Sequence, residues 1–109
     1  MGIEFEEVFE IMVKAAEKKF KANWPSIKDY ASVELDKIAT TIVNIEYLYK
    51  SGKISEQEAY ILFEMQKNTA RSVMLALQGM TLIMVEEVIN ESLKAIKDLV
   101  NGKIGFLLL

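Results

Sequence analysis

The stretch of residues 73–85, VMLALQGMTLIMV, limits what this chain can fold into more than any other part of it. Only Gln78, Gly79 and Thr81 interrupt its apolar residues. On a helix these apolar side chains would point in every direction, so the stretch has to be covered on all sides. We therefore expect it to lie at the centre of the protein, with other helices packed around it.

The composition and the spacing of polar residues predict a single all-helical domain over residues 1–109. The chain is 51% hydrophobic and 27% charged, and it contains one proline, which is typical of a globular helical protein. The formal net charge of −3 is unfavourable for binding nucleic acid, because phosphates require a basic face. No nucleic-acid partner is therefore expected.

Three segments have the periodicity of amphipathic helices, and they cover approximately residues 3–22, 27–50 and 55–101. The third segment has no firm stop signal before Asn101-Gly102. Its one candidate break is Gln78-Gly79, because a glycine inside a helix costs about 1 kcal/mol relative to alanine. The expected fold is all-α, a bundle of three or four helices with a long third helix.

The predicted helix starts depend on local capping signals. Ser55 and Glu58 have the spacing of a capping box, in which each side chain bonds the backbone N–H of the other residue. Pro25 disfavours a helical conformation for Trp24. We therefore expect the second helix to begin after Trp24, with Ser26 as its cap.

Apolar side chains at helical spacing predict which face of each helix is buried. The first two helices should bury Phe5, Phe9, Met12, Ala16 and Phe20, and Ala31, Leu35, Ile38, Ile42, Ile45 and Tyr49. The start of the third should bury Ile61, Leu62, Met65 and Ala70, with Glu64, Lys67 and Arg71 in water. Its last part should bury Val85, Val88, Ile89, Ser92, Ile96 and Leu99. The buried face therefore rotates along the third helix, and its two ends should pack on different neighbours.

The apolar middle of the third helix is the candidate interaction site. Two neighbouring helices cannot easily surround it, so a second copy of the chain, crossing near Gln78-Gly79, would complete its cover. The residues expected to face such a partner or a bound ligand are Met74, Leu77, Gln78, Gly79, Met80 and Met84. Because methionine-rich surfaces adapt to different ligands, a small-molecule or lipid-binding bundle with a Met-lined pocket is the alternative.

The residue types exclude many enzyme mechanisms. Histidine and cysteine are both absent, which removes the commonest general base, thiolate nucleophiles and the usual zinc ligands. Glu6, Glu7 and Glu10 read E-E-x-x-E, which resembles half of the metal motif of the all-helical nucleotide pyrophosphatases of the MazG type. That family carries a second motif, E-x-x-D, on its next helix. The nearest counterpart here is Glu34 and Asp36, spaced E-x-D, which does not put both carboxylates on one helix face.

This resemblance covers one half-motif, and we do not assign the chain to the family. It implies a Mg²⁺-dependent nucleotide phosphohydrolase that uses Glu6, Glu7, Glu10 and Glu34, which is the second alternative. The preferred reading is a non-enzymatic interaction or assembly module acting as a homodimer, with no catalytic residue, cofactor or metal.

The two ends of the chain bear on its location and partners. The N-terminal residues are acidic and amphipathic, unlike a signal peptide, and a lack of cysteine fits a reducing compartment, so we expect a cytoplasmic protein. Residues 73–85 are fewer than the roughly 20 apolar residues of a transmembrane helix, and membrane contact is not expected. The apolar tail, residues 103–109, should either fold back over the bundle or dock on a protein partner.

Overall fold

The computed structural model describes residues 2–77 and 80–109, and only the backbone of Leu77. In these residues the secondary structure is entirely helical. The elements are α1 (Phe5–Phe20), the 3₁₀ turn η1 (Lys21–Asn23), α2 (Trp24–Lys50), α3 (Glu56–Leu77) and α4 (Leu82–Ile104). The predicted all-α bundle is confirmed, in its four-helix form.

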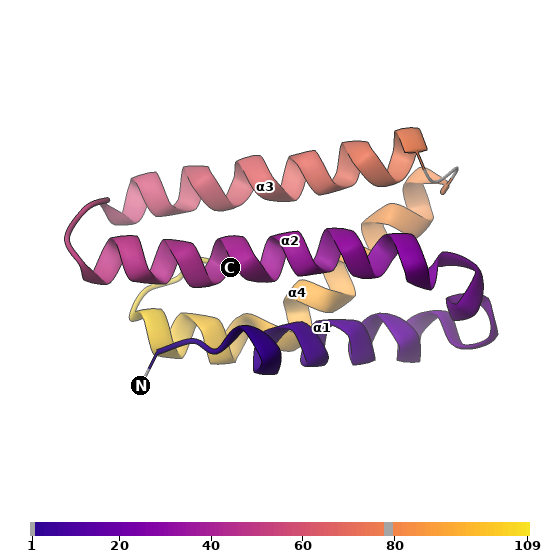
Figure 1. Ribbon diagram of the computed structural model, residues 1–109, viewed down its shortest axis with the longest axis horizontal. Helices are drawn as coiled ribbons and strands as arrows, with labels where there is room; N and C mark the ends of the chain where they lie inside the picture. Colours follow the sequence, from indigo (N-terminus) through magenta and orange to yellow (C-terminus); the bar gives the residue numbers. More distant parts are fainter. Residues whose placement is uncertain (1, 78–79) are drawn as a thin grey trace.

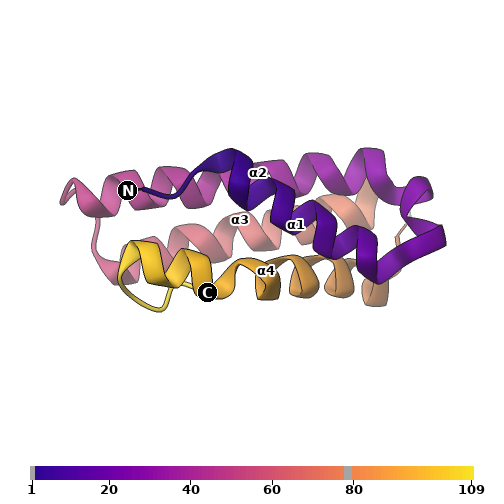
Figure 2. The same ribbon diagram turned by 90° about the horizontal axis from the view of Figure 1, so that it is seen from below.

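The four helices form two pairs (Figure 1). α2 and α3 lie side by side and antiparallel along the long axis of the molecule, whereas α4 runs diagonally behind them. The view turned by 90° shows α1 crossing in front of the others (Figure 2). α1 packs mainly on α4, and α2 packs mainly on α3. The resulting bundle measures 42 × 24 × 18 Å.

The corner between α1 and α2 differs from the predicted one. Lys21 ends α1 with a φ of 49°, and η1 leads directly into α2. Trp24 is helical, with φ −57° and ψ −45°, because Pro25 is tolerated in the first turn of a helix. Ser26 lies inside that turn, and its hydroxyl donates to the carbonyl oxygen of Asn23 at 2.7 Å. The predictions for Trp24 and Ser26 are therefore wrong.

The start of α3 matches its prediction. The N–H of Glu58 donates to Ser55 Oγ at 3.1 Å, and the N–H of Ser55 donates to Glu58 Oε1 at 2.9 Å. These two reciprocal bonds are the predicted capping box. Just before it, Gly52 adopts a φ of 73°, a conformation that glycine reaches without steric cost, and the chain turns there from α2 towards α3.

The segment expected as one long helix is divided into α3 and α4. α3 ends at Leu77, and α4 begins after Thr81, whose backbone is extended. The Thr81 hydroxyl accepts a hydrogen bond from the N–H of Met84 at 3.2 Å. This bond gives a partner to one of the backbone N–H groups that have none within the first turn of a helix. The predicted break, Gln78-Gly79, lies between the two helices but outside the described residues.

The end of α4 also differs from the prediction. The helix continues through Asn101-Gly102 to Ile104, and Gly105 ends it with a φ of 94°. The N–H of Gly105 donates to the carbonyl oxygen of Asn101 at 3.0 Å. The left-handed turn that glycine favours is therefore three residues later than expected.

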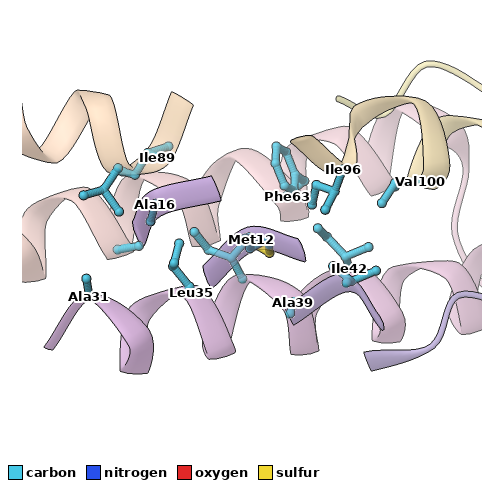
Figure 3. Packing of buried hydrophobic residues seen from close by; sticks show 14 of the residues in the cluster. Met12, Ala16, Ala31, Leu35, Ala39, Ile42, Phe63, Ile89, Ile96 and Val100 are labelled. Carbon is cyan, nitrogen blue, oxygen red and sulfur yellow. The ribbon is translucent and has the colours of Figure 1, made fainter. Parts of the chain in front are cut away.

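A continuous apolar core takes side chains from every helix (Figure 3). The predicted buried faces of α2 and α4 are confirmed for all but their last residue, whereas on α1 Phe5, Phe9 and Phe20 are only partly buried. Those that are fully buried include Met12, Ala16, Ala31, Leu35, Ile38, Ile42, Ile45, Val85, Val88, Ile89, Ser92 and Ile96. The hydroxyl of Ser92 donates to the carbonyl oxygen of Met12 at 3.2 Å, so the one polar residue in this set joins α4 to α1.

The C-terminal tail folds back over the bundle, which is the first of the two predicted alternatives. Leu108 is buried in the core. The ring of Phe106 packs against Tyr49 of α2, with 4.8 Å between the ring centroids. Asn101 of α4 holds the backbone of Leu108 and Leu109 through its side-chain amide. These contacts close the end of the bundle at which α2 leads into α3.

Candidate functional site

The predicted interaction residues lie mostly in the core. Met74 and Met80 are buried, and Met84 is partly buried against the same cluster. Leu77 is described only by its backbone, and Gln78 and Gly79 lie outside the described residues. Because α4 folds back on α3, Met74 and Met80 are covered by the chain itself. Their role in a dimer or ligand contact stays a prediction.

Part of the central apolar stretch is nevertheless in water. Leu82 and Ile83, in the first turn of α4, are 57% and 71% exposed. They form a small apolar corner at the junction of α3 and α4. This corner is short, because Glu86 and Glu87 follow within one turn and pair with Arg71 and Lys19.

The buried face of α3 is opposite to the predicted one. Ile61, Leu62 and Met65 are 49%, 36% and 60% exposed. The residues that face the core are instead Ala59, Phe63, Ala70 and Met74. Of the four residues predicted to be buried, only Ala70 is, and the prediction for the other three is wrong.

The position of α4 accounts for this difference. The side chains of Lys67 and Arg71, expected in water, are only 22% and 28% exposed. Arg71 pairs with Glu86 of α4, and Lys67 pairs with Glu64 at 3.0 Å. Since α4 folds back beside α3, the charged side of α3 is partly covered by α4. Ile61, Leu62 and Met65 are left outside.

The exposed side of α3 continues as a regular stripe of uncharged residues. It starts at Leu62 and advances in alternating steps of three and four, the spacing of a helix-packing seam. Its members are Leu62, Met65, Thr69, Ser72 and Ala76, and we call them the outer seam. All five are exposed, with Leu62 at 36%. The seam spans about 21 Å at 1.5 Å per residue.

The hydroxyl of Thr69, in the middle of the outer seam, is already hydrogen-bonded within α3. The hydroxyl of Thr69 donates to the carbonyl oxygen of Met65 at 2.9 Å, one turn earlier in the same helix. Its hydrogen-bonding proton is therefore used inside α3. Burying Thr69 against a partner would cost less than burying a free hydroxyl.

A groove of about 350 Å³ runs along the outer seam between α2 and α3. From α3 it is lined by Leu62, Met65, Gln66 and Thr69, and from α2 by Thr41, Asn44, Ile45 and Leu48. The hydroxyl of Thr41 lies 3.4 Å from Gln66 Oε1 and donates to it across the groove. The candidate site is thus a two-helix surface, with an apolar end near Leu48 and Leu62.

The acidic residues of the phosphohydrolase alternative are not gathered into a site. Glu6, Glu7 and Glu10 are exposed on α1, where Glu7 lies 3.9 Å from the ammonium group of Lys103. Glu34 is buried on α2; one of its oxygens pairs with Lys37 at 3.2 Å, and the other has no partner in the described residues. In the part of the chain that the structure describes, no group of three or more acidic side chains could hold a metal ion.

Among the helices of residues 2–77 and 80–109, none combines the length and the apolar character needed to cross a bilayer. Comparison of the chain with protein-family models, with curated proteins and with solved structures finds no match. The candidate site therefore depends on geometry and residue chemistry alone.

The sequence contained a signal for the outer seam that the prediction did not use. Small and uncharged residues continue the spacing of Leu62 and Met65 through Thr69, Ser72 and Ala76. A stripe of this kind next to charged residues can belong to an interface as well as to a core. The two possibilities differ only in where the neighbouring helices lie.

Proposed function

We propose that this protein is a non-enzymatic assembly module that acts as a homodimer. The observation that carries the proposal is the exposed apolar side of α3, formed by Ile61, Leu62 and Met65. Fully burying a Leu, Ile or Met side chain contributes about 1.5–3 kcal/mol. Contiguous exposed apolar residues on a soluble protein are typical of interaction surfaces. The cysteine-free composition suits such a role in the cytoplasm.

The symmetry of a homodimer strengthens this argument. In a two-fold interface both copies use the same surface. Each apolar residue of that surface is therefore buried once in each copy, and its contribution counts twice in the dimer. The gain has to exceed the loss of translational and rotational freedom, about 4–15 kcal/mol. Ile61, Leu62 and Met65 are 49%, 36% and 60% exposed, so burying what remains of them in both copies contributes roughly 4–9 kcal/mol, which lies within that range.

The two alternatives have less support. A Met-lined pocket would need methionines at a hollow, but Met74 and Met80 are packed in the core, and only Met65 lines the groove. A phosphohydrolase would need Glu34 beside the acidic residues of α1. Glu34 instead lies under the surface of α2 and pairs with Lys37.

Native mass spectrometry of the protein, purified under non-denaturing conditions, separates these functions. The chain has a mass of 12.4 kDa. The proposal predicts a species of twice this mass, without the additional mass of a bound small molecule. A monomer that retains a small molecule would support the ligand-binding alternative and overturn the proposal. Calorimetric titration with Mg²⁺ tests the remaining alternative, and saturable binding lost in Glu6→Gln would favour it.

A further inference from the structure

We propose that two copies of this chain pack antiparallel through the outer seam, with the two-fold axis beside Thr69. This inference rests on the proposed homodimer and specifies its interface. Thr69 is the middle member of the seam, so it would face its own counterpart. Leu62 of one copy would lie opposite Ala76 of the other, and Met65 would lie opposite Ser72.

The sizes of the seam residues favour the antiparallel arrangement. The large side chains, Leu62 and Met65, are at the start of the seam, and the small ones, Ser72 and Ala76, are at its end. Antiparallel packing places each large residue against a small one, which lets the two surfaces interlock. Parallel packing would press large against large at one end and leave a gap at the other.

The α2–α3 side of the molecule is large enough for such an interface. The bundle is 42 Å long, and its narrowest dimension is 18 Å. The area of this side is therefore on the order of 800 Å², which is close to the ~800 Å² that each partner buries in an interface of standard size. The corner at Leu82 and Ile83 is too short to provide this area.

A second copy is the partner that the seam residues fit. The five seam positions carry no charge, so they offer nothing to attract an acidic or basic partner. The seam runs from large to small residues along α3. It is therefore complementary to the same seam of a second copy that runs in the opposite direction. An isologous interface needs this property, since the same residues form both sides.

Single cysteines test this arrangement directly, because the native chain contains none. Under a mild oxidant, Thr69→Cys should form a covalent dimer at least about tenfold faster than Asn90→Cys, an exposed position on α4, because the dimer holds the two thiols at high effective concentration. Leu62→Cys alone should not cross-link faster than this control. A mixture of Leu62→Cys and Ala76→Cys, equilibrated so that subunits exchange, should give the mixed dimer.

The outcomes distinguish this inference from the proposed function. Rapid self-cross-linking of Leu62→Cys would indicate a parallel pair and overturn the antiparallel arrangement. A wild-type dimer in which Thr69→Cys cross-links no faster than Asn90→Cys would leave the homodimer standing and overturn this interface. A wild-type monomer would overturn both.

Discussion

The side-chain oxygen of Asn101 accepts a hydrogen bond from the backbone N–H of Leu108 at 3.0 Å. The same oxygen accepts the N–H of Leu109 at 3.0 Å, and the amide nitrogen of Asn101 lies 3.3 Å from the Leu109 carbonyl oxygen, to which it donates. One side chain in the last turn of α4 therefore fixes the tail. The tail in turn brings Leu108 into the core.

Replacing Asn101 should loosen this attachment. Asn101→Ala leaves the backbone groups of Leu108 and Leu109 without their partner, and the expected loss is about 1–3 kcal/mol in the free energy of unfolding. Urea denaturation followed by circular dichroism measures it. The matched control is Asn90→Ala, at an exposed position of the same helix, which should change stability by less than about 0.5 kcal/mol. Equal losses in the two variants would contradict the role of Asn101.

Removing residues 106–109 should lower the melting temperature and increase the binding of a dye that fluoresces on apolar surface. The reason is that Leu108 covers the core and Phe106 covers Tyr49. Leu107→Ala is the control, since that side chain is 81% exposed, and it should melt like the parent. A truncated protein with an unchanged melt would show that the tail does not stabilise the bundle.

Ser55→Ala removes one half of the capping box at the start of α3. The N–H of Glu58 then loses its acceptor, and caps of this kind contribute about 0.5–2 kcal/mol. The difference is measured by thermal denaturation. Ser51→Ala, at the other end of the same loop, changes no helix start and should have little effect. If the two variants lose the same stability, the cap is not the cause.

Tyr49 connects stability to pH at the same end of the bundle. Burial raises the pKa of its hydroxyl above the usual 10.0, and the hydrogen bond to Glu56 and the charge of that carboxylate raise it further. Because the folded pKa is the higher one, the neutral hydroxyl favours folding. This contribution is complete below pH 10 and is lost as the pH rises through the folded pKa.

The pKa of Tyr49 can be followed by the ultraviolet absorbance change of tyrosinate, as the difference between the parent and Tyr49→Phe. Glu56→Gln keeps the side-chain shape and removes the charge, so it should shift this titration towards lower pH. An unchanged titration would mean that Glu56 does not act on Tyr49.

Local signals in the sequence were sufficient where one short motif decides the conformation. The Ser55–Glu58 capping box depends on four consecutive residues, and it forms as predicted. The prediction of the buried face of α2 was also correct, because residues such as Leu35 and Ile42 lie on a single apolar face of that helix. For α2 there was no competing face of equal strength.

The buried face of α3 could not be predicted in this way, because the helix has two candidate faces. Periodicity detects a face but not the position of the neighbouring helices. The large residues Leu62 and Met65 gave the stronger signal, yet Phe63 and Ala70 are the residues that face the core. The position of α4 decides between the two faces, and the ion pair between Arg71 and Glu86 forms as a consequence of that position.

The same fold-back changed the candidate site. On one continuous helix, Met74 and Met80 would need a second chain to cover them. Thr81 instead caps a separate helix, and the chain covers both methionines itself. The outer seam remains exposed and available to a partner. That these residues are exposed can be recognised only when the positions of α2 and α4 are known.

Light scattering coupled to size-exclusion chromatography tests the homodimer most directly. At tens of micromolar the wild-type protein should have twice the chain mass of 12.4 kDa, and Met65→Asp, which puts a charge into the outer seam, should be a folded monomer. Tyr47→Asp, at an exposed position of α2 that does not line the groove, is the matched control and should remain a dimer. A wild-type protein that elutes with the mass of one chain at these concentrations would contradict the account.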